Sequence, residues 1–483
     1  MLRSALFGAA ILAALAAAGS TARAERPPNI VLIVSDDQGY GDLEISDDYL
    51  IAPHLARLAD EGVRLTSYYV TAAACTPSRG SLLTGRYPQR HGTFELFRNH
   101  RVDMGYEYDE FEYSTSHERI LGMDTREILL PTLLKDAGYT SAIYGKWDLG
   151  QFRRFLPLQR GFDDFYGFVN TGIDFFTHKR YGVHSMVHKN EPSRKDQGTY
   201  CDEIFTREAL RFIERNQDRP FFLYVPYFAP HVASSLDPAI RGAPQAPERF
   251  VQMYLEKYPD LDDNLVEGQR YGEPAMVPSR QRRRLLHLAS LTAMDDGIGQ
   301  ILAALDERGL AENTLVVFFS DNGGTGTANN GPLRGGKGNL FEGGIRVPLI
   351  ARWPNRLPAG TVNDELVTAL ELFPTFLRAA GVEPPAHLVL DGHDVTDVLA
   401  GEAASPREEM FWDFRGQWAV RAGPWKLLGG RRGSGLFNLA EDIGETEDLS
   451  ERHPEVVEDL TARLAGWRRA MEQAEPRGPF RDF

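Results

Sequence analysis

Cysteine is nearly absent from this sequence, which also lacks any excess of positive charge. The 483 residues include two cysteines, Cys75 and Cys201, and carry a net charge of -15. Two cysteines exclude a disulfide-rich scaffold and leave one disulfide, Cys75–Cys201, as the simplest use of both. The acidic charge argues against a general binder of nucleic acid or anionic membranes. It does not exclude an anionic small substrate, because a local basic pocket can override the overall field.

Long apolar segments are also missing, except at the N-terminus. Residues 1–24, MLRSALFGAAILAALAAAGSTARA, combine the basic Arg3, an apolar run and the small-x-small pattern Ala22-Arg23-Ala24. This pattern is typical of a cleaved export signal, and the run is too short to span a bilayer comfortably. A retained membrane anchor is the alternative. We expect no membrane span after signal removal, and a mature protein that begins near Glu25 and is periplasmic or secreted.

Strands alternate with helices over most of the chain. The composition, 42% hydrophobic and 25% charged, is that of a globular protein with a large core. The length fits two to three domain-sized units, or one large α/β domain with an appendage. Strands are predicted at NIVLIVSDD, VRLTSYYV, TSAIYG, PFFLYVPY, NTLVVFFSDNGG and VPLIARW, and helices at Leu55–Glu61, Pro77–Thr84, ILLPTLLKDAGY and Arg282–Arg308, the last long and amphipathic. The alternation predicts an α/β fold with a large, mostly parallel sheet sandwiched by helices.

Two insertions and a C-terminal change of pattern interrupt this alternation. Phe94–Met123 and Pro230–Arg280 have no clear period and are predicted to be long surface loops. From about residue 405, the short strands EMFWDF, WAVRAG, WKLLGG and GLFNL precede a helix from Pro454 to about Glu472. We therefore expect a catalytic α/β domain over 25–405 and, over 406–483, an α+β subdomain with a small antiparallel sheet and one helix.

Polar side chains follow two of the predicted strands. Asp36 and Asp37 come directly after NIVLIVS, and Asp321 and Asn322 follow TLVVFFS. Ligands of open parallel sheets bind beyond the carboxyl ends of the strands, so these side chains should converge. Clustered carboxylates repel unless a cation neutralises them, and oxygen ligands without thiolate or imidazole suit Ca²⁺ or Mg²⁺. Taken singly, each aspartate is more typical of a cap or a turn.

Cys75 lies where the helix that contains Pro77 should begin. A helix N-terminus offers free N–H groups and partial positive charge, which favour a bound anion and lower a thiol pKa. Arg79 lies one turn along on the same face. The arrangement suits a tetrahedral oxyanion, although a lone arginine on a helix is usually a solvated surface residue.

The segment CTPSRGSLLTGRYP, which begins at Cys75, resembles the signature C-x-P-S-R-x-S-x-x-T-G of the type I sulfatases. Five more segments resemble motifs of that family in the family's order, over roughly residues 28–355: PNIVLIVSDDQGYGDL, AGYTSAIYGKWDLG, RPFFLYVPYFAPHV, TLVVFFSDNGG and GPLRGGKGNLFEGGIRVP. GLFNLAEDIGETEDLS resembles the family's C-terminal subdomain. One motif would be weak, but six in order make chance matching very improbable. The resemblance implies an alkaline phosphatase-like fold.

The resemblance also assigns roles by position. The implied ligands of Ca²⁺ or Mg²⁺ are Asp36, Asp37, Cys75, Asp321 and Asn322. The implied catalytic residues are Cys75, Arg79, Lys146, His231, Lys337 and Asp321. Lys146 and Lys337 would hold sulfate oxygens, and His231 would contact the ester oxygen and help to protonate the leaving alcohol. Arg79 would orient the nucleophile, and Asp321 would take its proton.

In this family the signature cysteine is oxidised to formylglycine by a maturation enzyme. The aldehyde hydrates to a gem-diol, of which one hydroxyl attacks sulfur and the other expels the sulfate, so that one hard step becomes two. Conversion of Cys75 would leave Cys201 unpaired, which weakens the disulfide hypothesis.

The chain departs from the family at Asp148. The usual segment is K-W-H-L-G, and here it is Lys146-Trp147-Asp148-Leu149-Gly150. An aspartate at this substrate-binding position cannot donate a proton at neutral pH unless its pKa is raised. Asp148 would be a second base, would change the substrate class, or would weaken activity. We expect its carboxylate near residue 75, ionised and paired with Lys146 or an arginine.

The leading hypothesis is an exported, metal-dependent sulfatase that hydrolyses the sulfate ester of a carbohydrate or an aryl alcohol. A phosphoester or phosphonate monoester hydrolase on the same scaffold is the second hypothesis. A binding homologue that has lost catalysis is the third, motivated by Asp148. The Phe94–Met123 insertion should shape specificity, its aromatic side chains either stacking on the substrate's rings or packing on the core.

Overall fold

Ten strands form one mixed sheet in the computed structural model, which describes residues 26–43, 45–98, 101, 106–270 and 272–481. The predicted export signal, residues 1–24, lies outside the described residues. The strand order is β15 (Thr361–Asn363), β2 (Val63–Leu65), β14 (Leu349–Arg352), β13 (Thr314–Ser320), β1 (Asn29–Ser35), β10 (Phe221–Pro226), β4 (Thr140–Lys146), β5 (Asp164–Phe168), β8 (Met186–His188) and β9 (Glu191–Pro192).

The centre of this sheet is parallel, as the alternation predicts. Neighbours from β13 through β1, β10 and β4 to β5 all pair in parallel. On one flank β14 is antiparallel to both β13 and β2, and on the other β8 is antiparallel to β5 and β9. The segment VRLTSYYV does not form the one predicted strand: it divides into β2 and β3 (Tyr68–Tyr69), and β3 pairs with β16 (Val367–Thr368).

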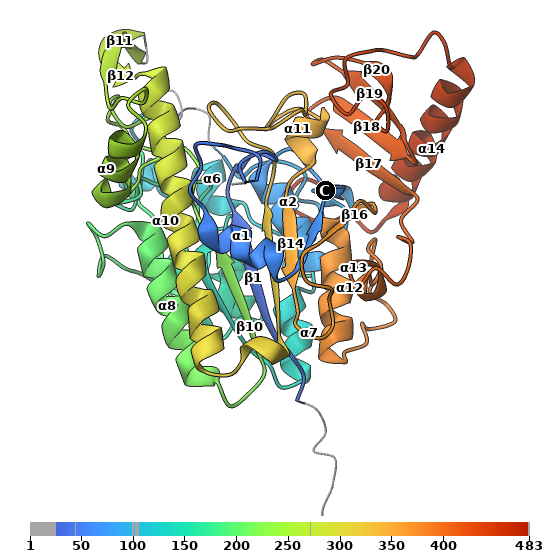
Figure 1. The fold of residues 1–483 in the computed structure, drawn as a ribbon, viewed down its shortest axis with the longest axis horizontal. Coiled ribbons are helices and arrows are strands. Elements are labelled where there is room, and N and C mark those ends of the chain that lie inside the picture. The colour runs from blue at the N-terminus through green and yellow to red at the C-terminus, as the bar shows by residue number, and fades with distance from the viewer. Residues whose placement is uncertain (1–25, 44, 99–100, 102–105, 271, 482–483) are drawn as a thin grey trace, which may run out of the picture.

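Helices cover both faces of the sheet (Figure 1). Alternate residues of β1 enter opposite cores: Val31 and Ile33 pack in one, and Ile30 and Leu32 in the other. The first face carries α1 (Pro53–Asp60), α8 (Cys201–Asn216), α9 (Glu248–Lys257) and α10 (Arg280–Glu307). The second carries α2 (Cys75–Thr84), α7 (Leu130–Asp136), α12 (Ala369–Ala380) and α13 (Thr396–Leu399). This is the predicted three-layer α/β arrangement.

Helix α10 differs from the prediction of an amphipathic helix. Residues 285–295 are buried on every side, because α1, α8 and α9 pack around this stretch. Most of its charged residues lie near its two ends, and Asp295 and Asp296 lie between them.

The two insertions contain regular structure that the sequence pattern does not reveal. The first holds the short helices α5 (Glu110–Ser114) and α6 (His117–Ile120). The second is not a loop: it holds α9 and a hairpin of β11 (Leu265–Arg270) and β12 (Glu273–Pro278). Other short elements are α3 (Pro88–His91), α11 (Glu342–Ile345), β6 (Lys179–Arg180), β7 (Val183–His184), η1 (Arg153–Phe155), η2 (Pro157–Gln159) and η3 (Ala311–Asn313).

The C-terminal part has the predicted form. An antiparallel sheet of β17 (Glu409–Phe414), β18 (Gln417–Ala422), β19 (Trp425–Gly430) and β20 (Gly435–Asn438) carries one helix, α14 (Pro454–Gln473). It lies beside the large sheet (Figure 1) and shares a hydrophobic core with Tyr69, Ala73 and Leu340. No helix among the described residues is long and apolar enough to cross a membrane.

Candidate active site

The carboxyl ends of β1 and β13 bring the predicted oxygen ligands together. The register pairs Ser35 with Ser320, so Asp36 and Asp37 continue beside Asp321 and Asn322. The Asp37 N–H donates to Asp321 Oδ1 over 3.2 Å, and Asn322 Nδ2 donates to Asp37 Oδ1 over 2.8 Å. All four side chains are buried. The predicted convergence is therefore present.

Cys75 begins α2 and points into this carboxylate cluster. Its thiol donates to Asp36 Oδ1 over 3.4 Å, and Lys337 Nζ lies 3.0 Å from its Sγ. The expectation of a lowered thiol pKa is wrong: burial and the carboxylates of Asp321 and Asp36 raise the pKa of Cys75, and they outweigh Lys146 and Lys337. The expected disulfide alternative is also wrong, because Cys75 and Cys201 are both free.

Two buried cations, Arg79 and Lys146, and the partly buried Lys337 neutralise the carboxylates. Arg79 donates through Nε over 2.9 Å to Asp321 Oδ2, with Nη2 2.7 Å from the same oxygen. Lys146 Nζ donates to Asp36 Oδ2 over 2.7 Å, and Lys337 donates to Asp37. Arg79 is therefore not a solvated surface residue, and neither lysine is.

The two adjacent aspartates differ in charge preference. Burial raises the pKa of Asp36 to about 7, with Asp321 acting in the same direction and Lys146 and Arg79 opposing it. Burial acts on Asp37 in the same sense, but Lys337 and His231 outweigh it and hold the Asp37 pKa below its usual range. Asp37 is thus the more strongly anionic of the pair.

His231 lies in the loop after β10, over the cluster. Its Nδ1 is 2.7 Å from the carbonyl oxygen of Val232, which assigns the proton to Nδ1 and leaves Nε2, 3.6 Å from Asp37 Oδ2, as the free ring nitrogen. Burial, with Lys337 and Lys146, lowers the pKa of His231 despite the opposing effect of Asp37. The imidazole is therefore neutral.

The donor set fits a hard divalent cation. Ligand atoms of Asp36, Asp37, Cys75 and His231 all lie within 4.8 Å of one another. Asn322 Oδ1 is buried and accepts no hydrogen bond from any residue that the structure describes. A buried carbonyl oxygen without a donor beside two carboxylates is the environment that Ca²⁺ or Mg²⁺ satisfies.

Asp148 reaches the site from the end of β4, beside residue 75. Its Oδ2 accepts a hydrogen bond from Thr76 Oγ1 over 2.8 Å, and it is 3.9 Å from Lys146 Nζ. Lys146 makes its shorter contact with Asp36, so the expected Lys146–Asp148 pair is only a long one. Burial raises the pKa of Asp148, with Lys146 and Arg79 opposing that rise.

A cavity of about 370 Å³ opens above Cys75. Besides the predicted Asp37, Cys75, His231 and Lys337, it is lined by Leu96, Arg98, Thr171, Arg180, Tyr181, Val232, Ser234, Arg241 and Thr325. The ring of Tyr181 lies near two guanidinium groups, with its centroid 5.1 Å from Arg180 Cζ and 4.5 Å from Arg241 Cζ. The sequence did not single out Arg180, Tyr181, Ser234 and Arg241, because they lie in segments without a motif; Leu96 and Arg98 belong to the insertion that was expected to shape specificity.

Two side chains among the described residues of the first insertion, those of Leu96 and Arg98, line this cavity. The aromatic rings of Tyr106, Tyr108 and Tyr113 pack on one another instead, with neighbouring centroids 4.8 and 6.4 Å apart. Among the described residues of this insertion, packing is therefore the main role of the aromatic side chains.

A cysteine at a helix N-terminus lies beside a carboxylate cluster at the carboxyl edge of a three-layer α/β sandwich, and the fold is alkaline phosphatase-like. The phosphonate monoester hydrolase SpPMH from Silicibacter pomeroyi shares this fold, with a TM-score of 0.62, 19% identity and coverage of 93% of this chain and 96% of that one. The family model described as Sulfatase matches residues 28–382, and the model described as N-sulphoglucosamine sulphohydrolase, C-terminal, matches residues 336–468. The chain belongs to the sulfatase family and is a sulfuric ester hydrolase.

Several curated and solved relatives are similar over most of their length. N-acetylgalactosamine-6-sulfatase of Canis lupus familiaris is 33% identical over 443 residues, which cover 86% of this chain and 74% of that protein. Arylsulfatase A of Homo sapiens is 30% identical over 497 residues, covering 93% and 84%. The crystal structure of Ps i-CgsB in complex with k-i-k-neocarrahexaose has a TM-score of 0.75 and 29% identity, covering 92% of this chain and 93% of that one.

Proposed function

We propose that this protein is an exported, formylglycine-dependent sulfatase that removes sulfate from a sulfated carbohydrate. The observation that carries the proposal is the position of Cys75. It lies at the start of α2, against Asp36 and Lys337, below a cavity lined with further basic side chains. The relatives named N-acetylgalactosamine-6-sulfatase and the neighbour in complex with k-i-k-neocarrahexaose support a sugar as the organic part.

The buried residues around Cys75 supply binding and charge stabilisation. We propose that Asp36, Asp37, Asp321 and Asn322 hold Ca²⁺ or Mg²⁺ together with residue 75. When bound, the cation and the hydrated aldehyde of formylglycine supply Lewis-acid assistance and the nucleophile. The chain's own carboxylates would be neutralised by this cation, so that they do not repel the anionic sulfate ester.

The cationic and imidazole side chains orient the ester. Lys146 and Lys337, both at the cluster, hold sulfate oxygens through charge-assisted hydrogen bonds. Arg79 fixes Asp321 by two contacts and orients the nucleophile, whose proton Asp321 accepts. His231 faces the cavity with Nε2, which holds no proton in the neutral imidazole; to protonate the leaving oxygen, this nitrogen would first have to gain a proton in the substrate complex. Asp148 accepts a hydrogen bond from Thr76 and thereby helps to position the first turn of α2, which carries residue 75.

Hydrolysis of a phosphoester or phosphonate monoester is the second candidate, because SpPMH has the same fold. The same cations would serve either tetrahedral anion. A binding protein without catalysis is less well supported, since Cys75, Arg79, Lys146, His231 and Lys337 are all gathered at one site.

We further propose how the protein is matured and exported, and how its chain divides into two parts. A formylglycine-generating enzyme would convert Cys75 during export, and the mature protein would begin near Glu25 in the periplasm or outside the cell. The catalytic part would extend over 25–405 and the C-terminal subdomain over 406–483.

Peptide mass analysis and paired substrates test the proposal. The tryptic peptide with residue 75 should carry formylglycine, and sulfate esters should turn over faster than phosphate esters of the same phenol and the same sugar. Cys75→Ser should accumulate a sulfated enzyme and not turn over, because serine has no second hydroxyl. An unmodified Cys75 in fully active enzyme, or a preference for phosphate, would contradict it.

A further inference from the structure

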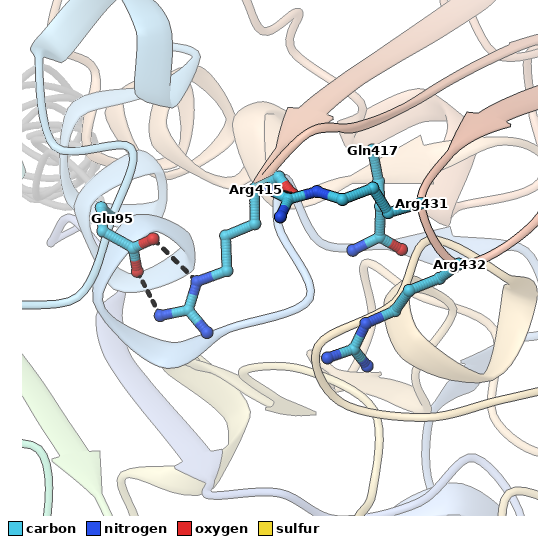
Figure 2. Close-up of a pocket in the computed structure, with 5 residues that line it drawn as sticks. All are labelled: Glu95, Arg415, Gln417, Arg431 and Arg432. Atoms are coloured by element: carbon cyan, nitrogen blue, oxygen red, sulfur yellow. Dashed lines mark hydrogen bonds and ion pairs between the residues drawn. The ribbon is translucent and has the colours of Figure 1, made fainter. Parts of the chain in front are cut away.

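A second basic pocket adjoins the active-site cavity on the side of the C-terminal sheet. It has a volume of about 500 Å³ and is lined by Glu95, Arg415, Gln417, Arg431 and Arg432. Figure 2 shows these five side chains around one space, with Glu95 paired to Arg415. Three guanidinium groups against one carboxylate make the pocket net positive, whereas the whole chain carries -15.

The loops that form this pocket also form the active-site cavity. Glu95 lines the second pocket and its neighbour Leu96 lines the first. Gln417 Nε2 donates to the carbonyl oxygen of Gly338 over 3.0 Å, and Gly338 follows Lys337 directly. The two pockets are therefore adjacent, separated by these two loops.

Gln417 has an unused acceptor in this pocket. The side chain is 3% exposed, and its Oε1 is buried without a hydrogen-bond partner among the described residues. Because Nε2 is committed to Gly338, the amide cannot be reversed without losing that bond. An unpaired buried acceptor beside guanidinium groups is matched by a ligand that carries both an anion and a hydroxyl or amide donor.

Arg431 and Arg432 line the pocket and have few hydrogen-bond partners among the described residues. Arg431 makes one long bond, 3.5 Å, to the carbonyl oxygen of Arg415, and Arg432 makes no hydrogen bond or ion pair with any residue that the structure describes. Arg415 has φ 53° in the two-residue turn between β17 and β18, where asparagine or glycine is preferred. A charged residue at this strained position indicates that its side chain is required there.

We propose that this pocket is a subsite for a second anionic group, a sulfate or a carboxylate, on a sugar next to the one whose sulfate ester lies at Cys75. The inference rests on the proposed function and narrows its substrate class to polyanionic oligosaccharides. Guanidinium groups bind such oxyanions in bidentate fashion. Gln417 Oε1 accepts a hydrogen bond from a hydroxyl of the same sugar unit.

Direct binding to the full-length protein tests the subsite independently of turnover. The probes are short fluorescein-labelled dextran sulfate and oligogalacturonate chains, which carry only sulfate or only carboxylate, followed by fluorescence anisotropy. Arg431→Ala/Arg432→Ala should weaken the Kd for at least one probe about tenfold, since one charge-assisted bond is worth about 1.5 kcal/mol. Arg469→Ala, an exposed arginine of α14 outside the pocket, is the matched control and should leave the Kd unchanged.

Glu95→Gln should have the opposite effect on the binding of the anionic probes. Removal of the one carboxylate among the five lining residues should tighten binding, and added salt should reduce the gain. An unchanged Kd in the double variant, an equal loss in Arg469→Ala, or weaker binding in Glu95→Gln would overturn the subsite. Failure of the proposed function is distinguishable, because it would appear as absent turnover of para-nitrophenyl sulfate by the wild-type protein.

Discussion

Asp148, the residue at which this chain departs from its family, has the surroundings of a buried hydrogen-bond acceptor. Its Oδ2 accepts a hydrogen bond from the Thr76 hydroxyl over 2.8 Å. Lys146 Nζ is 3.9 Å away and donates to Asp36 instead. Thr76 follows residue 75 directly. Asp148 therefore helps to fix the first turn of α2, in which residue 75 lies.

Replacement of Asp148 by asparagine should therefore be mild. The amide oxygen of the new side chain would still accept from Thr76, so kcat/KM towards para-nitrophenyl sulfate should fall by less than about tenfold. Lys146→Ala should cost at least about a hundredfold, because it removes the proposed contact to the sulfate and leaves Asp36 without its ion-pair partner. Steady-state kinetics at equal formylglycine content checks both. If Asp148→Asn is as inactive as Cys75→Ser, Asp148 is an essential acid-base group.

Asp202, in the first turn of α8, fixes the loop that carries His231. Its two oxygens accept the N–H groups of Phe228 over 3.0 Å and Ala229 over 2.9 Å. Burial nevertheless raises the pKa of Asp202 to about 6, from 3.8, against the effect of these two bonds. The folded state therefore holds this proton more tightly than the unfolded state does.

This raised pKa predicts a pH-dependent stability difference. Ionisation of Asp202 costs folding free energy above about pH 6, and the cost disappears below the unfolded pKa near 4. The unfolding free energy of wild type minus that of Asp202→Asn should rise by up to about 3 kcal/mol as the pH falls from about 7 to about 4. Urea denaturation across this range measures it. A difference that is constant with pH would contradict the assignment.

At the scale of elements, the end of β4 places Lys146 by a close approach of two strands. Gly145 has φ 137°, and a Cβ there would lie 2.0 Å from the carbonyl oxygen of Pro226 in β10. Lys146 is the next residue. The spacing between β4 and β10 therefore depends on glycine at this position.

Gly145→Ala should separate these strands and displace Lys146. We expect a loss of about 3 kcal/mol or more in unfolding free energy, and a fall in kcat/KM of the protein that still folds. Gly138→Ala is the matched control: its φ is 81°, but no atom lies within 4 Å of the added Cβ. That change should cost only about 1 kcal/mol and leave activity intact. Equal losses from both would show that conformational strain, and not the approach of β10, is decisive.

The elements that were predictable are those whose pattern is local. Continuous apolar runs ending in polar residues gave β1, β4, β10 and β13, and the Pro–Gly boundaries gave α2. The direction of β14 and the division of VRLTSYYV depend on partners far along the chain, which no local pattern contains. The helix α9 and its following hairpin were hidden because their charged, proline-rich sequence resembles a loop.

At the scale of the whole molecule, the convergence of the residues around Cys75 could be predicted because they lie at strand ends and in motifs. Arg180, Tyr181 and Arg241 converge on the same cavity from two segments without either signal. The second pocket is harder still to predict, since Glu95 and Arg415 are 320 positions apart. Such sites depend on how the two sheets pack, and packing is a global property.

A buried ionic cluster joins the C-terminal sheet to the loop of Lys337. Lys426 of β19 lies 2.8 Å from both Glu342 of α11 and Glu445. Glu445 Oε2 also accepts the N–H of Glu342 over 2.6 Å. Lys426 and Glu342 are fully buried, and Trp412 of β17 donates to the carbonyl oxygen of Val70 over 2.8 Å. These contacts should make the large and small sheets unfold as one unit.

Lys426→Met tests this coupling. The change leaves Glu342 and Glu445 facing each other without the shared cation, and removal of one partner of a buried ionic group costs about 3 to 5 kcal/mol. The exposed pair Arg452–Glu447, with side chains 68% and 58% exposed, provides the matched control. Arg452→Met should cost less than about 1 kcal/mol.

Urea denaturation should be followed by tryptophan fluorescence, to which Trp412 and Trp467 contribute, and by far-ultraviolet circular dichroism, which is dominated by the large sheet and its helices. Both signals should shift together in Lys426→Met, because a destabilised contact within one cooperative unit lowers the stability of the whole. If only the fluorescence transition moves, the C-terminal sheet unfolds separately, and the cluster holds the Lys337 loop without stabilising the catalytic part.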